Sequence, residues 1–254
     1  MQQEDLEEKL RLQEAEYKVP THWQLGRADD LRYRRLSQLL ARKMTKILRD
    51  AGSGKVRVID VGCGDGAGTY QLWESLRAAG FDTIVDGHDY SERAIAWSRE
   101  KTAPLADETL RFTVGPAEDT SYDPEDGRTV IVLLREVIEH LTEEQIDAAF
   151  GVLREHFANP YLLLTTPTVN SPVEPKHLRH YTADTVRDTL ERNSFTVIEV
   201  NGFGFRPKSL FKPLVWLKTK LNRRKLLWRL TAPLWRAYPV SLSMTVYGIG
   251  RASR

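Results

Sequence analysis

Short apolar runs alternate with helix-periodic stretches along most of the chain. Seven runs are typical of buried strands: Val56–Val61, Thr83–His88, Leu110–Val114, Thr129–Leu134, Tyr161–Thr165, Phe195–Val200 and Met244–Gly250. The stretches between them predict helices at Thr69–Ala79, Ser91–Lys101, Thr142–His156 and Thr182–Arg192. This alternation predicts an α/β fold with a doubly wound, seven-stranded, mostly parallel sheet and helices on both faces. Ligands of such sheets bind at the carboxyl ends of the strands.

Two segments depart from this alternation. Residues 1–52 carry apolar positions at helical spacing and predict an N-terminal helical extension, which the glycines of Gly52-Ser53-Gly54 terminate. The core is expected over residues 53–204, with its final strand in 242–254. Between these parts, residues 205–241 predict a helical insertion, because Pro213 suits a first helical turn and leucines follow at helical spacing.

A glycine-rich turn follows the first predicted strand. Asp60 ends that strand, and Gly62, Gly64 and Gly66 allow the backbone to approach a ligand closely. The spacing is G-x-G-x-G rather than the G-x-G-x-x-G of many dinucleotide sites. Asp89 ends the second strand, where a carboxylate accepts hydrogen bonds from ribose hydroxyls. After the third strand, Ala117 and Glu118 are candidates to flank an adenine edge.

The run from Asp60 to Gly66, together with Asp89, resembles the first two motifs of the class I S-adenosylmethionine-dependent methyltransferases. The resemblance covers roughly Val56 to Val200 and implies a Rossmann-like methyltransferase fold whose last strand runs antiparallel. It implies S-adenosylmethionine as cofactor, with Gly62 and Gly64 along its methionine part and Asp89 on its ribose. The full set of expected cofactor residues is Asp60, Gly62, Cys63, Gly64, Gly66, Asp89, Tyr90, Ala117, Glu118 and Arg135.

An E-x-x-E-H segment follows the fourth strand. Glu136, Glu139 and His140 share one face if the segment forms a helical turn. An imidazole with a pKa near neutrality is suited to remove a proton from a hydroxyl, so His140 is the expected general base. Ubiquinone-biosynthesis O-methyltransferases are similar here. Downstream, His177 and His180 lie in a run resembling the H-x-R-x-Y-T segment of small-molecule methyltransferases, which implies a role at the acceptor.

Metal binding is the alternative chemistry for the same residues. Glu136, Glu139 and His140 offer two carboxylates and an imidazole, a set that suits a divalent ion. Small-RNA 2′-O-methyltransferases resemble this segment and use a later histidine as a further ligand. The chain lacks the Phe-Glu-Trp signature of that family, so a metal is not favoured. A third interpretation is structural: the acids cap a turn and the histidine bonds to backbone.

Charge is distributed unevenly. The net charge is only +2, yet the last acid is Glu199, and residues 206–241 hold ten basic residues with Trp216, Trp228 and Trp235. A basic stretch with tryptophans is typical of contact with an anionic membrane surface, or with RNA, or of a cap over the site. The single cysteine, the acidic first twenty residues and the absence of an 18-residue apolar stretch favour a cytoplasmic protein. The basic stretch adds the expectation that this protein is peripheral on the inner face of the membrane.

These observations predict an O-methyltransferase acting on a hydroxyl of a small-molecule, lipid-linked or glycan-type acceptor, with His140 as general base. One alternative is a metal-dependent RNA 2′-O-methyltransferase using Glu136, Glu139 and His140. Another is a non-catalytic, cofactor-binding adaptor at the membrane. The pattern predicts no oligomeric state.

Overall fold

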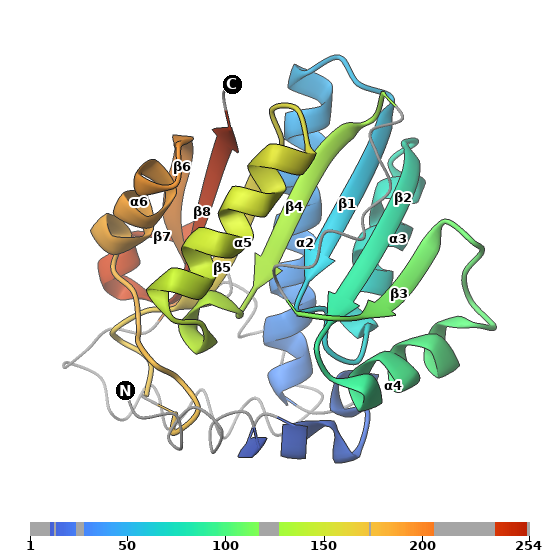
Figure 1. The fold of residues 1–254 in the computed structure, drawn as a ribbon, viewed down its shortest axis with the longest axis horizontal. Coiled ribbons are helices and arrows are strands. Elements are labelled where there is room, and N and C mark those ends of the chain that lie inside the picture. The colour runs from blue at the N-terminus through green and yellow to red at the C-terminus, as the bar shows by residue number, and fades with distance from the viewer. Residues whose placement is uncertain are drawn as a thin grey trace.

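One twisted sheet forms the centre of the fold in the computed structural model (Figure 1), which describes residues 11–12, 14–23, 28–116, 127–172, 174–205 and 237–252. Within these residues the sheet has eight strands in the order β3-β2-β1-β4-β5-β8-β6-β7. The strands are β1 Lys55–Val61, β2 Asp82–Asp89, β3 Leu110–Val114, β4 Thr129–Arg135, β5 Tyr161–Pro167, β6 Phe195–Phe205, β7 Ala237–Tyr238 and β8 Ser243–Ala252. Strands β1 to β5 pair in parallel, and β8 is antiparallel to both β5 and β6. The predicted fold class is confirmed.

Helices cover both faces of this sheet. The α-helices are α2 Ala28–Asp50, α3 Ala67–Ala78, α4 Glu92–Thr102, α5 Glu143–His156 and α6 Ala183–Arg192. Short 3₁₀ helices are η1 Ala15–Lys18, η2 Thr21–Trp23, η3 Ile138–His140 and η5 Val240–Leu242. Figure 1 shows α5 and α6 in front of the sheet and α2 and α3 behind it. Among the described residues, no helix combines the length and apolar character needed to cross a membrane.

The core consists of two apolar layers, one on each face of the sheet. Strand β1 contributes to both because its side chains alternate: Val58 belongs to the layer that includes α2 and α3, and Ile59 to the layer that includes α5 and α6. Both side chains have no exposed area. Burying such a side chain contributes roughly 1.5–3 kcal/mol, so a strand buried on both faces is a strong determinant of this fold.

Helix α2 belongs to the same core. Leu36, Leu40, Met44 and Leu48 lie on one helical stripe and are fully buried or nearly so. Helix α2 also packs against α3. Helix α2, which lies in the predicted N-terminal extension, therefore shares one hydrophobic core with the sheet.

Two helices begin with reciprocal caps. The Thr142 side chain accepts from the Gln145 amide, and the Gln145 side chain accepts from the Thr142 amide, which together form a capping box. Thr182 forms the same kind of box with Thr185. Because each box satisfies two amides that the helix leaves unpaired, both helices start at defined residues.

The predicted insertion begins and ends inside the sheet. Strand β6 continues to Phe205, and Ala237–Tyr238 forms β7 by pairing antiparallel with Gly202 and Phe203. This eighth strand is not in the sequence-based prediction, because a two-residue strand has no hydrophobic period to detect. Residues 206–236, which carry the basic and tryptophan positions of the predicted membrane-contacting segment, lie outside the described residues.

Candidate active site

The glycine-rich turn connects β1 to α3 at the carboxyl end of the sheet. Gly62 has φ +72°, and a Cβ there would lie 2.4 Å from Cγ2 of Val137. Gly66 has φ +76°, with a Cβ position 2.7 Å from the Ser98 hydroxyl. Both positions therefore require glycine for conformation and for space. The turn lines a cavity of about 580 Å³, which is within the range of small-molecule sites.

Asp89 lies beside this turn at the end of β2. One carboxylate oxygen accepts from the Gly64 amide at 2.9 Å, and the other accepts from the Ser91 amide at 3.0 Å. Burial raises the pKa of Asp89 to about 6, although these two hydrogen bonds oppose the rise. Asp89, Tyr90 and the turn residues Cys63 and Gly64 all line the cavity. Burial raises the pKa of the Cys63 thiol well above its usual value, which keeps it protonated.

Asp60 and Arg135 form a buried ion pair next to the turn. The Asp60 side chain has no exposed area, and its Oδ2 accepts from the Thr69 hydroxyl at 2.6 Å and from Arg135 Nη2 at 3.3 Å. Arg135 lines the cavity and packs over Gly68, where a Cβ would lie 2.0 Å from its Nη1. Asp60 thus lies behind the cavity wall and reaches it through Arg135.

His88 is a cavity residue that the sequence analysis missed. Its ring bonds to the Thr113 hydroxyl through Nδ1 and to the Pro116 carbonyl through Nε2, each at 3.0 Å. A carbonyl only accepts, so Nε2 carries the proton and Thr113 donates to Nδ1. His88 therefore holds the loop after β3. The sequence signal that could have identified His88 is its position directly before Asp89 in a buried strand. The predicted adenine residues Ala117 and Glu118 lie outside the described residues.

The E-x-x-E-H segment forms the turn after β4. Glu136 has φ +56°, a left-handed conformation that costs energy in a residue other than glycine. Its Oε1 accepts from the Thr165 hydroxyl at 3.1 Å. Glu139 is fully buried, and its Oε2 accepts from the Thr166 hydroxyl at 3.0 Å. Two neighbouring threonines of β5 thus orient the two carboxylates at this edge of the sheet.

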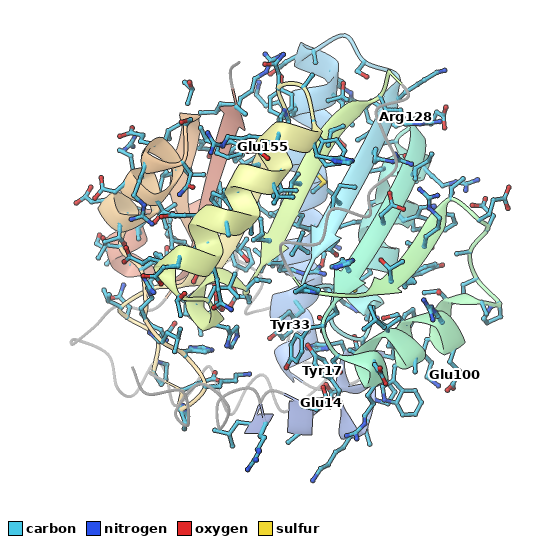
Figure 2. The ribbon with its side chains drawn as sticks, in the orientation of Figure 1. Glu14, Tyr17, Tyr33, Glu100, Arg128 and Glu155 are labelled. Carbon is cyan, nitrogen blue, oxygen red and sulfur yellow. The ribbon has the colours of Figure 1, made fainter. Side chains whose placement is uncertain are left out.

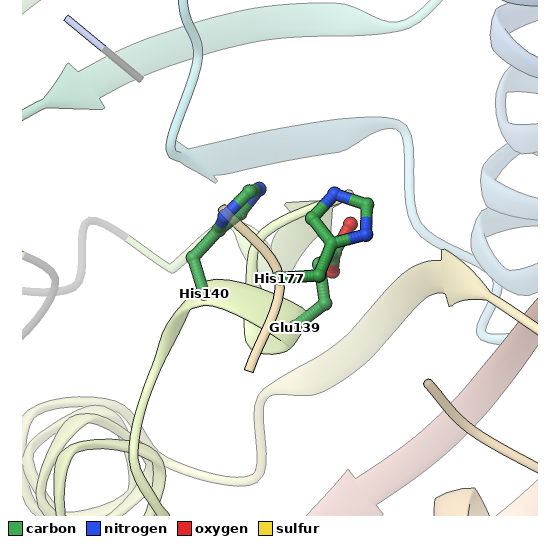
Figure 3. Close-up of side chains that lie close together, drawn as sticks. All are labelled: Glu139, His140 and His177. Carbon is green, nitrogen blue, oxygen red and sulfur yellow. The ribbon is translucent and has the colours of Figure 1, made fainter. Parts of the chain in front are cut away.

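His177 joins this turn from a distant loop (Figure 3). Potential ligand atoms of Glu139, His140 and His177 all lie within 4.8 Å of one another. His140 Nδ1 bonds to the Lys176 carbonyl at 3.3 Å, so this nitrogen donates and Nε2 keeps its lone pair. His177 Nδ1 bonds to His180 Nε2 at 2.9 Å. Glu136, Glu139, His140 and His177 line the cavity, whereas His180 contacts it through His177.

The N-terminal segment contributes to the same cavity. Tyr17, His22 and Tyr33 line it, although the sequence analysis assigned them no role there. Figure 2 places Tyr17 and Tyr33 at the end of the sheet where the parallel strands terminate. One cavity therefore combines the glycine turn, the Asp89 carboxylate, the acid–histidine group and residues of the N-terminal segment.

Comparison with known proteins agrees with this geometry. The profile of a methyltransferase domain family matches residues 28–200. The chain belongs to this methyltransferase family. No curated protein matches the sequence. Similar solved structures include an S-adenosylmethionine-dependent methyltransferase from Aquifex aeolicus, with 14% identity, TM-score 0.51, and coverage of 82% of this chain and 88% of that chain. A second, from Archaeoglobus fulgidus, has 16% identity, TM-score 0.50 and coverage of 83% and 94%.

A phosphoethanolamine N-methyltransferase from Haemonchus contortus, solved with S-adenosylmethionine, has 15% identity and TM-score 0.51. The structural match covers 79% of this chain and 49% of that chain. These neighbours show the class I fold, and membership of the methyltransferase family supports S-adenosylmethionine as the cofactor. The likeness to the ubiquinone-biosynthesis type stays a prediction.

One property of the methyltransferase's histidine differs from the sequence-based expectation. Burial, with the nearby His177 and Lys176, lowers the pKa of His140 to about 3 rather than leaving it near neutrality. His140 is therefore a neutral imidazole throughout the physiological pH range. Burial also lowers the pKa of His180. Neutral imidazoles beside a buried carboxylate can accept a proton from a reacting hydroxyl or bind a divalent cation.

Proposed function

We propose that this methyltransferase transfers the methyl group of S-adenosylmethionine to a hydroxyl oxygen of a small-molecule, lipid-linked or glycan-type acceptor. The observation that carries the proposal is the position of Glu139, His140 and His177 on the wall of the cavity that also contains the glycine turn and Asp89. A proton acceptor is needed for a hydroxyl nucleophile, and this group supplies one within reach of the cofactor site.

His140 is the proposed general base. The acceptor oxygen attacks the methyl carbon while the carbon–sulfur bond breaks, and the hydroxyl proton passes to His140 Nε2. A pKa of about 3 makes His140 too weak a base to ionise a free alcohol. The oxygen becomes a strong acid only as it gains the methyl group, so the proton moves during or after transfer rather than before it. Alignment of oxygen, methyl and sulfur then carries most of the catalysis.

A metal-assisted transfer is the second candidate, favoured by the close approach of three ligand-type side chains. The buried Glu139 carboxylate and the neutral imidazoles of His140 and His177 form a set that divalent cations accept. These residues would hold the ion, which would supply polarisation of the acceptor hydroxyl. This candidate includes the 2′-hydroxyl of RNA as an acceptor.

Methyl transfer assays separate the candidates. Radiolabelled S-adenosylmethionine is incubated with phenolic, polyprenyl-linked, glycan and RNA acceptors, with EDTA or with added Mg²⁺ or Mn²⁺. His140→Ala is compared with His156→Ala, a histidine at the end of α5. His140 is supported as the general base if His140→Ala loses turnover, His156→Ala keeps it, and EDTA does not affect the unmodified protein. The metal-assisted candidate is supported if EDTA abolishes the turnover of the unmodified protein and added Mg²⁺ or Mn²⁺ restores it. Methylation of amines but of no hydroxyl refutes the proposal.

Membrane contact through residues 206–241 is proposed from the sequence alone, because ten basic residues and three tryptophans suit an anionic lipid surface. Flotation with anionic liposomes tests it, using the intact protein and a version that lacks residues 206–236. Salt-sensitive binding that the deletion abolishes supports lipid-linked acceptors. No binding by either protein refutes the membrane contact and favours RNA or a cap. Cofactor binding without turnover on any acceptor indicates an adaptor.

A further inference from the structure

Asp65 in the glycine turn is bonded to the N-terminal segment rather than to the solvent. Asp65 is only 2% exposed, and its Oδ2 accepts a hydrogen bond from the His22 amide at 3.0 Å. The His22 ring Nδ1 lies 3.1 Å from the same oxygen. The Asp65 carbonyl accepts from the Trp23 indole at 2.6 Å. His22 and Trp23, two consecutive residues of η2, therefore bind Asp65 of the glycine turn. Asp65 lies 43 and 42 positions after them in the sequence.

Tyr17 lies upstream in the same segment and enters the cavity. Its carbonyl accepts from the Trp97 indole of α4 at 3.0 Å, which fixes the backbone of η1. Its hydroxyl lies 3.3 Å from the position that a Cβ on Gly64 would take. Burial and the charge of Asp89 raise the pKa of Tyr17 well above its usual value, so the phenol stays protonated and available as a donor.

We infer that residues 14–23 form part of the cofactor site. Tyr17 contacts bound S-adenosylmethionine, and Asp65 is the positioning residue that holds the segment in place through His22 and Trp23. The inference depends on the cofactor alone and is independent of the acceptor, so it stands or falls separately from O-methylation.

The bonds of Asp65 explain why this role falls to the N-terminal segment. Within the turn itself Asp65 makes a long bond, 3.4 Å, from the Ala67 amide to Oδ1, which contributes little. Its shorter bonds all go to residues 22 and 23. A buried carboxylate loses much of its hydration, and the His22 amide replaces part of it with a hydrogen-bond donor, while the His22 ring lies beside the same oxygen. If residues 14–23 moved away, the Asp65 side chain would keep only its long hydrogen bond. These contacts therefore favour the position of the segment at the cavity.

Calorimetric titration with S-adenosylmethionine tests the inference on the full chain. Tyr17→Ala and Asp65→Ala are each expected to raise the Kd about tenfold, or 1.4 kcal/mol. Asp65→Asn keeps an oxygen for the His22 amide and is expected to recover most of the affinity. Asp107→Asn, which changes an exposed aspartate bonded to Arg77, is the matched control and leaves the Kd unchanged.

The double variant decides whether Asp65 acts through Tyr17. Tyr17→Ala with Asp65→Ala is expected to bind the cofactor no more weakly than Tyr17→Ala alone. If Asp65→Ala fails to fold, Trp23→Phe removes the indole donor to the Asp65 carbonyl and leaves the turn intact. In the unmodified chain, the cofactor should also slow proteolysis at Tyr17. A Kd within twofold of the original for Tyr17→Ala, or multiplied effects in the double variant, overturns the inference.

Discussion

Replacement of Arg135 by methionine tests the electrostatic support of the glycine turn. Met is close to Arg in length but carries no charge, so Arg135→Met leaves Asp60 buried beside Thr69 without its cation. The side chains of Arg135 and Asp60 are 8% and 0% exposed, so water cannot compensate. Removing one partner of such a pair costs about 3–5 kcal/mol of unfolding free energy. Urea denaturation at pH 8 measures this loss directly.

The loss should shrink as the pH falls. Burial raises the pKa of Asp60, whereas Arg135 and the Thr69 hydrogen bond lower it. The folded protein therefore binds a proton more readily than the unfolded chain, and its stability falls as pH rises from the ordinary aspartate pKa to the raised folded value. Without Arg135 the pKa of Asp60 in the folded protein rises further, so the pH range over which stability falls extends to higher pH. At pH 5 more of Asp60 is protonated than at pH 8, so the deficit in unfolding free energy should be smaller at pH 5.

Two comparisons identify the cause. Asp60→Asn removes the charge that needs the arginine, so Asp60→Asn with Arg135→Met should be about 1–3 kcal/mol more stable than the sum of the single changes predicts. Arg77→Met breaks an exposed pair with Asp107 and should cost no more than about 1 kcal/mol. An equal deficit for Arg135→Met at pH 5 and pH 8, or strict additivity in the double variant, refutes the reasoning.

Three further changes have defined outcomes. Gly62→Ala forces a Cβ to 2.4 Å from Val137 at φ +72°, and calorimetry should show loss of cofactor binding with about 1–3 kcal/mol of destabilisation. His88→Phe leaves the loop after β3 unsupported, so the KM for S-adenosylmethionine should rise while kcat changes little in steady-state assays. Because the pKa of Asp89 is about 6, cofactor affinity should weaken below pH 6, and Asp89→Asn should flatten that pH profile.

The sequence predicted the elements that are defined by local patterns. The run around Val58 and Ile59 is apolar on both faces, which is typical of a central parallel strand, and the structure places it there. Thr142 and Gln145 lie three residues apart, as a capping box requires. The glycine turn and Asp89 were predictable in the same way, because each lies at the end of a strand that is visible in the hydropathy pattern.

Contacts between distant segments could not be predicted in this way. The low pKa of His140 depends on burial and on His177, which lies on a separate loop. The docking of His22 on Asp65 spans 43 positions and has no periodic signature. Strand β7 is too short for a pattern and exists because Gly202 and Phe203 offer an open edge. In each case the determining partner is distant in the sequence or leaves no local pattern in it.

The parallel order of the strands explains why one cavity holds both the cofactor turn and the acid–histidine group. Strands β1 and β4 are neighbours, so the turn after β1 and the segment after β4 emerge side by side. Strand β5, the next neighbour, supplies the hydroxyls of Thr165 and Thr166 to the two carboxylates. The chain then returns, and the Leu178 amide bonds to the Glu139 carbonyl at 2.7 Å, which brings the adjacent His177 to His140. Backbone pairing thus places the acid–histidine group, for which we propose proton acceptance or metal binding, next to the glycine turn, whereas the choice of methyl acceptor depends on the loops that surround the cavity.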